Sequence, residues 1–267
     1  MSDTAELGRV TSLAPSAAAV EGDEGRVRGL VDAAKGLEEA DARGVLAWLA
    51  TAVPRPAVTS SFGAESAVLL HLLAEVAPQV PVLFLDTGLH FPETLAFRRD
   101  LAEQFGLQVV DLHPLRSVDE QARDRGHRLW ERDPDACCGL RKTVPLRQAL
   151  RSFDGWASGV RRVQTPERAD TPVVEARRHD GRWLVKVAPL AAWTDEDVGH
   201  YLDANELPRH PLASQGFRSI GCAPCTTAVA PDQDPRAGRW ASTAKTECGI
   251  HLDADGAVER TRAAAPG

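Results

Sequence analysis

Short apolar runs alternate along this chain with longer amphipathic runs, and this alternation narrows the range of folds more than any other feature. Runs of four to six apolar residues between polar or turn-forming residues are typical of buried strands. The longer segments between them carry apolar residues at helical spacing, as in 66–76 and 140–150. The predicted strands are 57–60, 80–85, 107–112 and 156–160. Strands separated by helices predict an α/β fold with a doubly wound, mainly parallel sheet.

Signals at the ends of segments support the helices and add a hairpin. Pro92 falls in the first turn of one predicted helix and Gly106 follows its end, the usual order of these residues. Thr194 is a predicted N-cap of a later helix. A β-hairpin at the edge of the sheet is predicted from two apolar segments and the turn between them: 173–177, 183–188 and Asp180-Gly181.

The chain divides into three parts. Residues 1–25 are rich in Ala, Ser, Gly and acids without periodicity, so we expect a mobile leader. Residues 26–228 carry the predicted α/β elements and form the main domain. Residues 229–267 form a predicted C-terminal tail, because the apolar periodicity fades from about Pro208 onward.

Charge and composition exclude several classes of protein. The 267 residues include 31 Lys and Arg against 38 Asp and Glu, so the formal net charge is −7. With an aromatic content of 5%, this charge argues against binding to nucleic acid or to an anionic membrane. Neither a signal peptide nor an apolar run of about 18 residues is found, so we expect a cytoplasmic protein.

Five cysteines in a chain with a single Met indicate metal or redox chemistry. Four of them form two pairs, Cys137-Cys138 and Cys222-Ala223-Pro224-Cys225. A disulfide within the adjacent pair is unfavourable, because adjacent Cα atoms lie about 3.8 Å apart and normal disulfides need at least about 4.4 Å. Four thiolates suit Zn²⁺ or an iron–sulfur cluster, although an adjacent pair is unusual for a zinc ribbon. Buried, inert thiols are the weaker alternative, because both pairs stand in polar segments that contain Gly or Pro.

The fifth cysteine, Cys248, lies near the end of the polar tail, with Lys245 and His251 close in sequence. An exposed cysteine near cationic residues is typical of a nucleophile. An unperturbed thiol is only about 3% thiolate at pH 7, so acceleration would come mainly from positioning and from cations on the leaving group. The candidate cations are Lys142, Arg161, Arg162, Arg236 and Arg239, and the alternative for each is a solvated surface residue.

Two loops that follow predicted strands are candidates for binding an anionic ligand. Open parallel sheets bind ligands at the carboxyl ends of strands, where a loop entering a helix presents N–H groups. The first loop is Ser60-Ser61-Phe62-Gly63, which matches neither the Walker A nor the GxGxxG pattern. Asp86 ends the second strand. An ordinary strand-to-helix turn is the alternative for both loops.

Seven short segments resemble those of assimilatory adenylyl-sulfate/phosphoadenylyl-sulfate reductases of the iron–sulfur, thioredoxin-dependent type. Each segment is modest support alone, but seven in the family's order between residues 57 and 251 are highly specific. The segments are Ser60-Ser61-Phe62-Gly63-Ala64, Leu85-Asp86-Thr87-Gly88 with Phe91-Pro92-Glu93-Thr94, Cys137-Cys138-Gly139-Leu140-Arg141-Lys142, Gly159-Val160-Arg161-Arg162, Gly221-Cys222-Ala223-Pro224-Cys225, Arg236-Ala237-Gly238-Arg239-Trp240 and Glu247-Cys248-Gly249-Ile250-His251.

The resemblance implies an adenine-nucleotide α-hydrolase-like, Rossmann-like fold and a [4Fe-4S] cluster. It implies catalysis by Cys248, with His251 near the nucleophile. Lys142, Arg236 and Arg239 are implied to neutralise the substrate's phosphate and sulfate. The implied cluster ligands are Cys137, Cys138, Cys222 and Cys225.

The chemistry implied by the resemblance is a two-step reduction of adenylyl sulfate. The Cys248 thiolate attacks the sulfonyl sulfur, AMP leaves, and an S-sulfocysteine remains on the enzyme. Thioredoxin or a similar dithiol then attacks Cys248 and releases sulfite, so the tail must close over the substrate and then swing out. The cluster is not expected to pass electrons, and the oligomeric state, including a homo-oligomer, is left open.

Three other functions stay open. One is a phosphoadenylyl-sulfate reductase or an enzyme that accepts both substrates. The loop that begins at Ser60 resembles that of reductases of the 3′-phosphorylated substrate, whereas the cluster cysteines resemble those of enzymes that use adenylyl sulfate. We give the cysteines more weight, because an entire cofactor site is harder to retain by chance than a loop. A non-catalytic iron–sulfur or zinc sensor would not need Cys248. A sulfur-transfer ligase that consumes ATP is disfavoured, because the loop lacks the Ser-Gly-Gly-x-Asp pattern.

Overall fold

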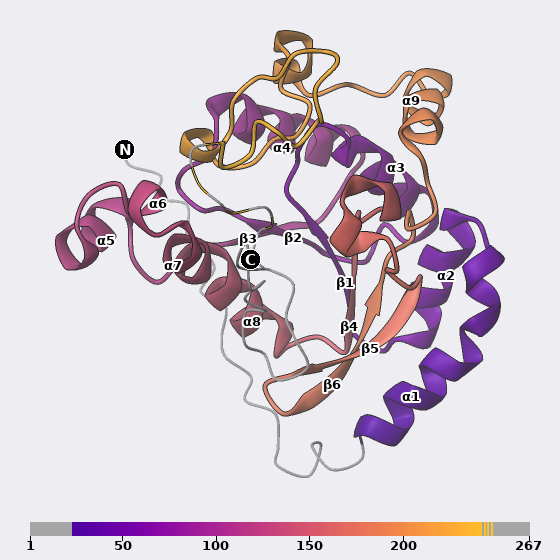
Figure 1. The fold of residues 1–267 in the computed structure, drawn as a ribbon. Coiled ribbons are helices and arrows are strands. Elements are labelled where there is room, and N and C mark those ends of the chain that lie inside the picture. The colour runs from indigo at the N-terminus through magenta and orange to yellow at the C-terminus, as the bar shows by residue number, and fades with distance from the viewer. Residues whose placement is uncertain (1–22, 242, 244, 246, 248–267) are drawn as a thin grey trace, which may run out of the picture.

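A computed structural model describes residues 23–241 together with 243, 245 and 247, built around a six-stranded sheet (Figure 1). The strand order is β3-β2-β1-β4-β6-β5, and every neighbouring pair is parallel except β5 and β6. The predicted doubly wound, mainly parallel sheet with an edge hairpin is confirmed. The strands are β1 Pro56–Ser60, β2 Val82–Leu85, β3 Val109–Leu112, β4 Gly155–Ser158, β5 Val174–His179 and β6 Arg182–Val187.

Helices connect the strands and cover both faces of the sheet. Pro92 opens α4 and Gly106 follows its end with a φ of +62°, as the sequence predicts. The Oγ1 of Thr194 accepts a hydrogen bond from the N–H of Asp197 (3.1 Å) at the start of α9. The helices are α1 Asp23–Ala33, α2 Ala42–Ala52, α3 Ser66–Val76, α4 Pro92–Gln104, α5 Val118–Arg125, α6 Leu129–Arg132, α7 Pro134–Cys138, α8 Val144–Leu150 and α9 Asp195–Ala204.

Some predicted boundaries differ from the observed ones. The helix predicted over 140–150 begins as a π-helical turn, Gly139–Thr143, and continues as α8. The strand predicted over 156–160 ends at Ser158, so the residues after it belong to a loop. The predicted leader lies outside the described residues up to position 22, and α1 begins at Asp23.

Alternate residues of each strand face opposite sides of the sheet, so each side has its own core. Val58 and Val82 are buried on the side covered by α2, α3 and α4. Leu83 is buried on the other side, with Leu146 and Leu150 of α8. The central strands are therefore covered by helices on both faces, as expected for a parallel sheet.

The strand order reverses between β1 and β4. From β1 the chain passes outward through β2 to β3 and then returns to the other side of β1 to form β4. Loops after strands at such a reversal lead apart and leave a crevice at the carboxyl ends of the strands. The chain after α9, coloured orange to yellow, crosses this end of the sheet (Figure 1), where Cys222 forms a β-bridge with His90.

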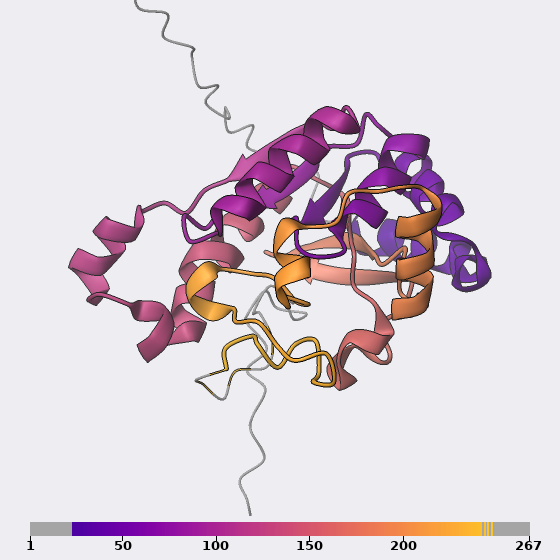
Figure 2. The same cartoon turned by 90° about the horizontal axis from the view of Figure 1, so that it is seen from above.

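Helices α5 and α6 project from one side of the molecule, away from the sheet, as Figure 2 shows from above. Among the helices that the structure describes, none combines the length and the apolar character needed to cross a bilayer.

Candidate active site

The loop after β1 lies at the carboxyl end of the sheet, beside the point where the strand order reverses. Phe62 donates its backbone N–H to the Oγ of Ser60 (3.1 Å) and has a left-handed φ of +47°. Its ring is fully buried and packs edge-on against Phe84, with centroids 5.4 Å apart. A Cβ on Gly63 would lie 3.3 Å from the carbonyl oxygen of Ile220, a tight contact that glycine avoids. The buried Phe62 ring anchors the loop and leaves Ser61 exposed to a ligand.

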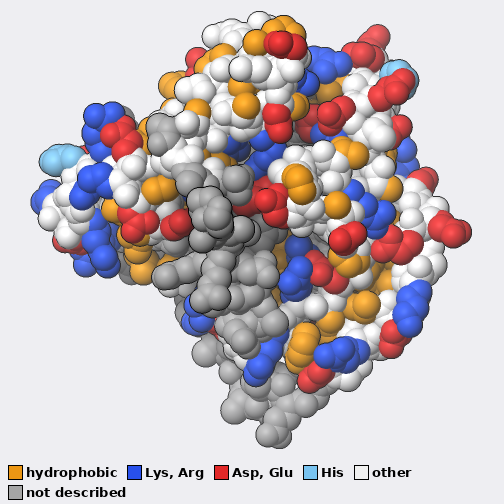
Figure 3. All heavy atoms as spheres, viewed as in Figure 1, with side chains coloured by type: hydrophobic (Ala, Val, Ile, Leu, Met, Phe, Trp, Pro, Cys, Tyr) orange, Lys and Arg blue, Asp and Glu red, His pale blue; other side chains and the backbone are white. Residues whose placement is uncertain are grey.

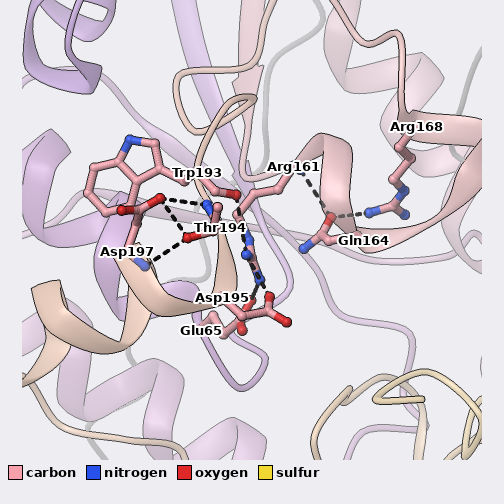
Figure 4. Close-up of polar contacts among 8 residues, drawn as sticks. All are labelled: Glu65, Arg161, Gln164, Arg168, Trp193, Thr194, Asp195 and Asp197. Carbon is pink, nitrogen blue, oxygen red and sulfur yellow. Dashed lines mark hydrogen bonds and ion pairs between the residues drawn. The ribbon is translucent and has the colours of Figure 1, made fainter.

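Arg161 follows β4 and faces the first loop. Its side chain is 3% exposed and pairs with the carboxylates of Glu65 (2.5 Å) and Asp195 (2.8 Å) (Figure 4). Because Glu65 is the N-cap residue of α3, the pair joins the loop after β4 to the loop after β1. Arg162 points elsewhere: it bonds to Glu38 (2.7 Å) and to the carbonyl oxygen of Thr171 (2.8 Å). The structure therefore separates two cations that adjoin in sequence.

Ser158 is a candidate ligand-binding residue that the sequence analysis missed. It is the last residue of β4, at the point where the strand order reverses. Its Oγ is buried and has no hydrogen-bond partner within the described part of the chain. A buried hydroxyl without a partner is uncommon, so this atom is available to a bound molecule. Its place at the carboxyl end of a strand beside a predicted loop was the signal that could have identified it.

The two cysteine pairs lie together although they are far apart in sequence. Cys137 and Cys138 end α7, while Cys222 and Cys225 flank a 3₁₀ turn, Ala223–Cys225. All four line one small cavity, together with Arg141 and Lys142, and none forms a disulfide.

Hydrogen bonds hold the second cysteine pair against the carboxyl end of β2. Ala223 donates its N–H to the carbonyl oxygen of Leu89 (2.7 Å), and the Oγ1 of Thr87 lies 3.3 Å from the Sγ of Cys222. Asp86 braces the same turn, because its carboxylate accepts from the N–H of Gly88 (2.9 Å). The predicted site residue Asp86 thus shapes the turn against which Cys222 and Cys225 are held.

Arg141 is a second residue that the sequence analysis did not single out. Its side chain is buried and donates to the carbonyl oxygen of Thr87 and to the Oε1 of Gln121 (3.1 Å). It therefore joins the loop after β2 to α5, beside the cysteine cavity. Only its position next to Lys142 in the motif could have marked it.

Burial disfavours uncompensated thiolates at Cys137 and Cys225. Burial raises the pKa of Cys137, and nearby Cys222 raises it further. Burial and the same neighbour raise the pKa of Cys225 to about 11. Such thiols stay protonated unless a bound metal centre takes up the charge of the thiolates.

Four cysteines around one cavity are a donor set that suits a structural zinc site or an iron–sulfur cluster. Within the described residues, no group of three His, Cys, Asp or Glu side chains is arranged to hold a single ion. In a four-iron cluster each cysteine binds a different iron. The residue types therefore fit a four-iron cluster, as they fit zinc.

The segment that carries Arg239 packs tightly beside the cysteines. The Arg239 guanidinium stacks over the ring of Trp240, 4.5 Å from its centroid. A Cβ on Gly221 would lie 2.2 Å from this guanidinium, and a Cβ on Gly238 would lie 2.1 Å from the carbonyl oxygen of Thr227. Gly238 is needed for this close approach because its neighbour is backbone, whereas at Gly221 the flexible end of the Arg239 side chain could move aside.

Ion pairs attach the last described residues to the rest of the chain. Glu247 pairs with Arg168 (2.8 Å) and Arg236 (3.1 Å). Lys245 pairs with Asp135 of α7. Cys248 and His251, the predicted nucleophile and its neighbour, lie outside the described residues.

At the carboxyl end of the sheet, an anion must be bound by individual cationic side chains. On the face drawn in Figure 3, acidic and basic side chains of the described residues are interspersed, and basic ones gather over α5 and α6. The formal net charge of −7 adds no long-range attraction for an anion. Lys142 lines the cysteine cavity, the Arg239 guanidinium lies against Gly221, and Arg236 pairs with Glu247.

Comparisons with known proteins agree with this geometry. The family model of the phosphoadenosine phosphosulfate reductase domain matches residues 55–228. The adenosine 5'-phosphosulfate reductase of Rhodococcus erythropolis is 48% identical over 187 residues, which cover 70% of this chain and 75% of the relative. That of Mycolicibacterium smegmatis is 48% identical over 70% of this chain and 79% of its own. That of Streptomyces coelicolor is 44% identical over 82% of this chain and 92% of its own.

Solved structures give the same picture of the fold. The phosphoadenylyl-sulfate reductase of Candida auris, in a phosphate complex, is similar with a TM-score of 0.64 and 28% identity. The match covers 76% of this chain and 97% of that one. The FMN adenylyltransferase of Candida glabrata, at 13% identity and a TM-score of 0.51 over 84% of both chains, shares the fold alone. Since the family model spans more than half of the sequence and close relatives cover most of it, the chain belongs to the phosphoadenosine phosphosulfate reductase domain family.

Proposed function

We propose that the protein reduces adenylyl sulfate to sulfite and AMP in the assimilation of sulfate. The observation that carries the proposal is the meeting of both cysteine pairs in one cavity at the carboxyl edge of the sheet. The proposal is supported by relatives named adenosine 5'-phosphosulfate reductase at 44–48% identity. A reducing compartment suits both free thiols and a dithiol partner, so we place the protein in the cytoplasm.

The nucleotide is proposed to bind in the crevice between the loops after β1 and β4. Ser60, Ser61 and Gly63 would offer hydroxyl and backbone N–H donors to its phosphate, as loops entering a helix do. The ring of Phe62 is buried, so it would anchor the loop and not contact the nucleotide directly. Ser158 would add its unpartnered hydroxyl.

The cations are proposed to divide into two groups. Lys142, Arg236 and Arg239 would neutralise the phosphate and sulfate groups, which lowers the barrier to loss of AMP. Arg161 would act through Glu65, by holding the nucleotide loop in place. Arg162 would act in a different place, by joining the loop after β4 to Glu38.

A [4Fe-4S] cluster is proposed on Cys137, Cys138, Cys222 and Cys225. These residues fit it because all four line one cavity, and because burial raises the pKa of Cys137 and Cys225, whose thiolates need a compensating charge. When bound, the cluster would supply charge compensation for the thiolates and a covalent link between α7 and the turn at Ala223–Cys225.

The proposed chemistry uses Cys248 as nucleophile, with His251 near it. The Cys248 thiolate forms a bond to the sulfate sulfur while the bond from that sulfur to the phosphate oxygen breaks, and AMP takes the electron pair. A thioredoxin-like dithiol then attacks the Sγ of Cys248, and sulfite leaves with the electron pair of the S–S bond. The second thiol of the partner releases Cys248 and forms the partner's disulfide, which balances the two electrons.

Trapping of the S-sulfo adduct tests this function. Anaerobically purified protein is mixed with adenylyl sulfate without a dithiol, and the intact mass is recorded. We expect one sulfonate on the wild type and none on Cys248→Ser, together with loss of sulfite production in the variant. Sulfite production by Cys248→Ser at the wild-type rate would contradict the nucleophile assignment. A colourless protein that contains zinc would contradict the cluster.

A preference for the 3′-phosphorylated nucleotide is the second candidate. It is favoured by the similarity to a phosphoadenylyl-sulfate reductase structure and by the loop that begins at Ser60. Comparison of kcat/KM for the two nucleotides distinguishes the two. We expect adenylyl sulfate to be preferred, and a strong preference for the 3′-phosphate would overturn that choice.

A further inference from the structure

Glu247 lies directly before the proposed nucleophile in the chain, and its carboxylate is held by two arginines. We propose that Glu247 is a positioning residue for the first half of the reaction. Its pairs with Arg168 and Arg236 fix the position of the residue directly before Cys248 in the chain. This inference rests on the proposed function and adds to it a role for the residues that hold the tail.

The contacts of Glu247 are stronger in kind than ordinary surface pairs. Arg168 donates a charged hydrogen bond to its Oε2 (2.8 Å), and Arg236 lies 3.1 Å from its Oε1. The Glu247 side chain is 14% exposed, so water screens these contacts less than at the surface. Charge-assisted hydrogen bonds of this kind are about twice as strong as neutral ones.

A second anchor of opposite charge lies two residues earlier. Lys245 is 7% exposed and pairs with Asp135 of α7, two residues before Cys137. Its backbone N–H donates to the Oγ1 of Thr243 (3.3 Å). The tail is thus attached on one side to the helix of the cysteine cavity and on the other side to Arg168, which follows β4.

Arg168 is itself connected to the nucleotide loop (Figure 4). The Oε1 of Gln164 accepts from Arg168 and also from the backbone N–H of Arg161 (3.1 Å). The Arg161 side chain pairs with Glu65 at the start of α3. A continuous chain of polar contacts therefore runs from the loop after β1 to Glu247, so the tail is positioned relative to the place where the nucleotide is proposed to bind.

The two half-reactions should respond differently to loss of this anchor. Attack on the sulfate sulfur requires the thiolate to be held against a bound nucleotide, and misplacement is costly for such a step. Attack by a dithiol on the S-sulfocysteine requires the tail to be accessible to the partner. Weakening the anchor should therefore slow formation of the adduct and leave its resolution unchanged or faster.

The test compares Glu247→Gln with Glu247→Asp and with a control, Glu24→Gln, which removes a charge from an exposed pair with Arg28. The rate of adduct formation is measured by quenched mass spectrometry, AMP affinity by equilibrium binding, and resolution by sulfite release from preformed adduct. For Glu247→Gln we expect roughly 10-fold slower adduct formation, the factor given by about 1.4 kcal/mol, with AMP affinity within about two-fold. Glu247→Asp should recover part of the rate, and Glu24→Gln should match the wild type.

Limited digestion with trypsin provides a readout that does not depend on sulfur chemistry. Cleavage after Lys245 is followed by mass, because this side chain is nearly buried against Asp135 in the anchored tail. We expect Glu247→Gln to be cleaved there several-fold faster than the wild type, because a loosened segment opens more often.

Two results would overturn the inference: unchanged adduct formation in Glu247→Gln, or a parallel loss of AMP affinity and rate. Unchanged cleavage after Lys245 would also count against it. If the wild type forms no adduct with either nucleotide, the proposed function fails, whereas the cleavage result still decides whether Glu247 anchors the tail.

Discussion

Asp154 and Glu247 are two carboxylates held by arginines, in different regions of the molecule. Asp154 directly precedes β4, is 8% exposed, and contacts Arg55 (2.8 Å) and Arg182 (3.1 Å). These partners adjoin β1 and begin β6, the two neighbours of β4, so Asp154 joins three adjacent strands. Glu247 is 14% exposed and joins the end of the described chain to residues after β4. Similar ion pairs therefore hold the strands together around Asp154 and hold the tail to the rest of the chain around Glu247.

This difference indicates that the contribution of an ion pair to the free energy of unfolding depends on the segments that it connects. The two arginines that contact Asp154 most closely, Arg55 and Arg182, belong to the sheet and its edges, so these contacts separate only on global unfolding. The groups around Glu247 can separate when the tail alone detaches, because the sheet does not depend on it. We therefore expect stability effects at Asp154 and kinetic effects at Glu247.

The largest change in stability is expected for Asp154→Asn. The variant should lower the free energy of unfolding by about 3 kcal/mol, because it leaves Arg182 close to a buried position without its carboxylate. Urea unfolding followed by circular dichroism measures the change. Asp203→Asn, which breaks an exposed pair with Arg209, is the control and should cost less than about 0.5 kcal/mol. Equal losses in the two variants would remove the distinction.

At low pH, the carboxylate of Asp154 should contribute less to the free energy of unfolding. Burial alone would raise its pKa, but hydrogen bonds and charges from Arg55, and the charges of Arg26 and Arg182, outweigh it and lower the pKa from 3.8. A lowered folded-state pKa means that the stabilisation is fully present above the unfolded-state pKa and is lost as pH falls through the folded-state value.

The difference in unfolding free energy between the wild type and Asp154→Asn should therefore be constant from pH 7 to about pH 5 and shrink below about pH 4. The slope approaches about 1.4 kcal/mol per pH unit at most, since one proton is involved. Urea unfolding at a series of pH values measures it. A difference that stayed constant down to pH 3 would contradict the role of the ionised carboxylate.

The smallest change in stability is expected for Glu247→Gln. Although it loses the charge that pairs with Arg168 and Arg236, it should lower the free energy of unfolding by less than about 1 kcal/mol, because only the tail detaches. The same urea measurement applies. A loss as large as that of Asp154→Asn would mean that the tail belongs to the cooperative unit of the sheet.

Much of the fold could be predicted because it depends on local periodicity. The predicted helix 66–76 coincides with α3, and the hairpin around Asp180 has the predicted turn. Strand ends were less accurate: Val80 was predicted to lie in β2, which begins at Val82. The start of β2 depends on which of its residues pair with β1. Val82 is the first residue of β2 that pairs, opposite Val58. That register is set by the neighbouring strand and not by local sequence.

The candidate site was only partly predictable. The residue types and spacing of the cysteines indicated a metal centre, and the structure brings both pairs to one cavity. Arg141 and Ser158 were missed, because an arginine or serine that becomes buried has no local pattern that distinguishes it from a solvated one. Arg161 and Arg162 adjoin in sequence but pair with Glu65 and Glu38 in different directions, which no motif could reveal.

The sequence by itself determined the α/β class, the cysteine sets and the segments that resemble the reductase family, because spacing and residue chemistry are local properties. Only the tertiary structure decided which charges meet. Asp154 pairs with Arg55, which is 99 positions away in sequence, and Arg168 pairs with Glu247, which is 79 positions away. Such pairs arise from strand order and from the path of the chain after α9, because ionic contacts need proximity in space rather than in sequence.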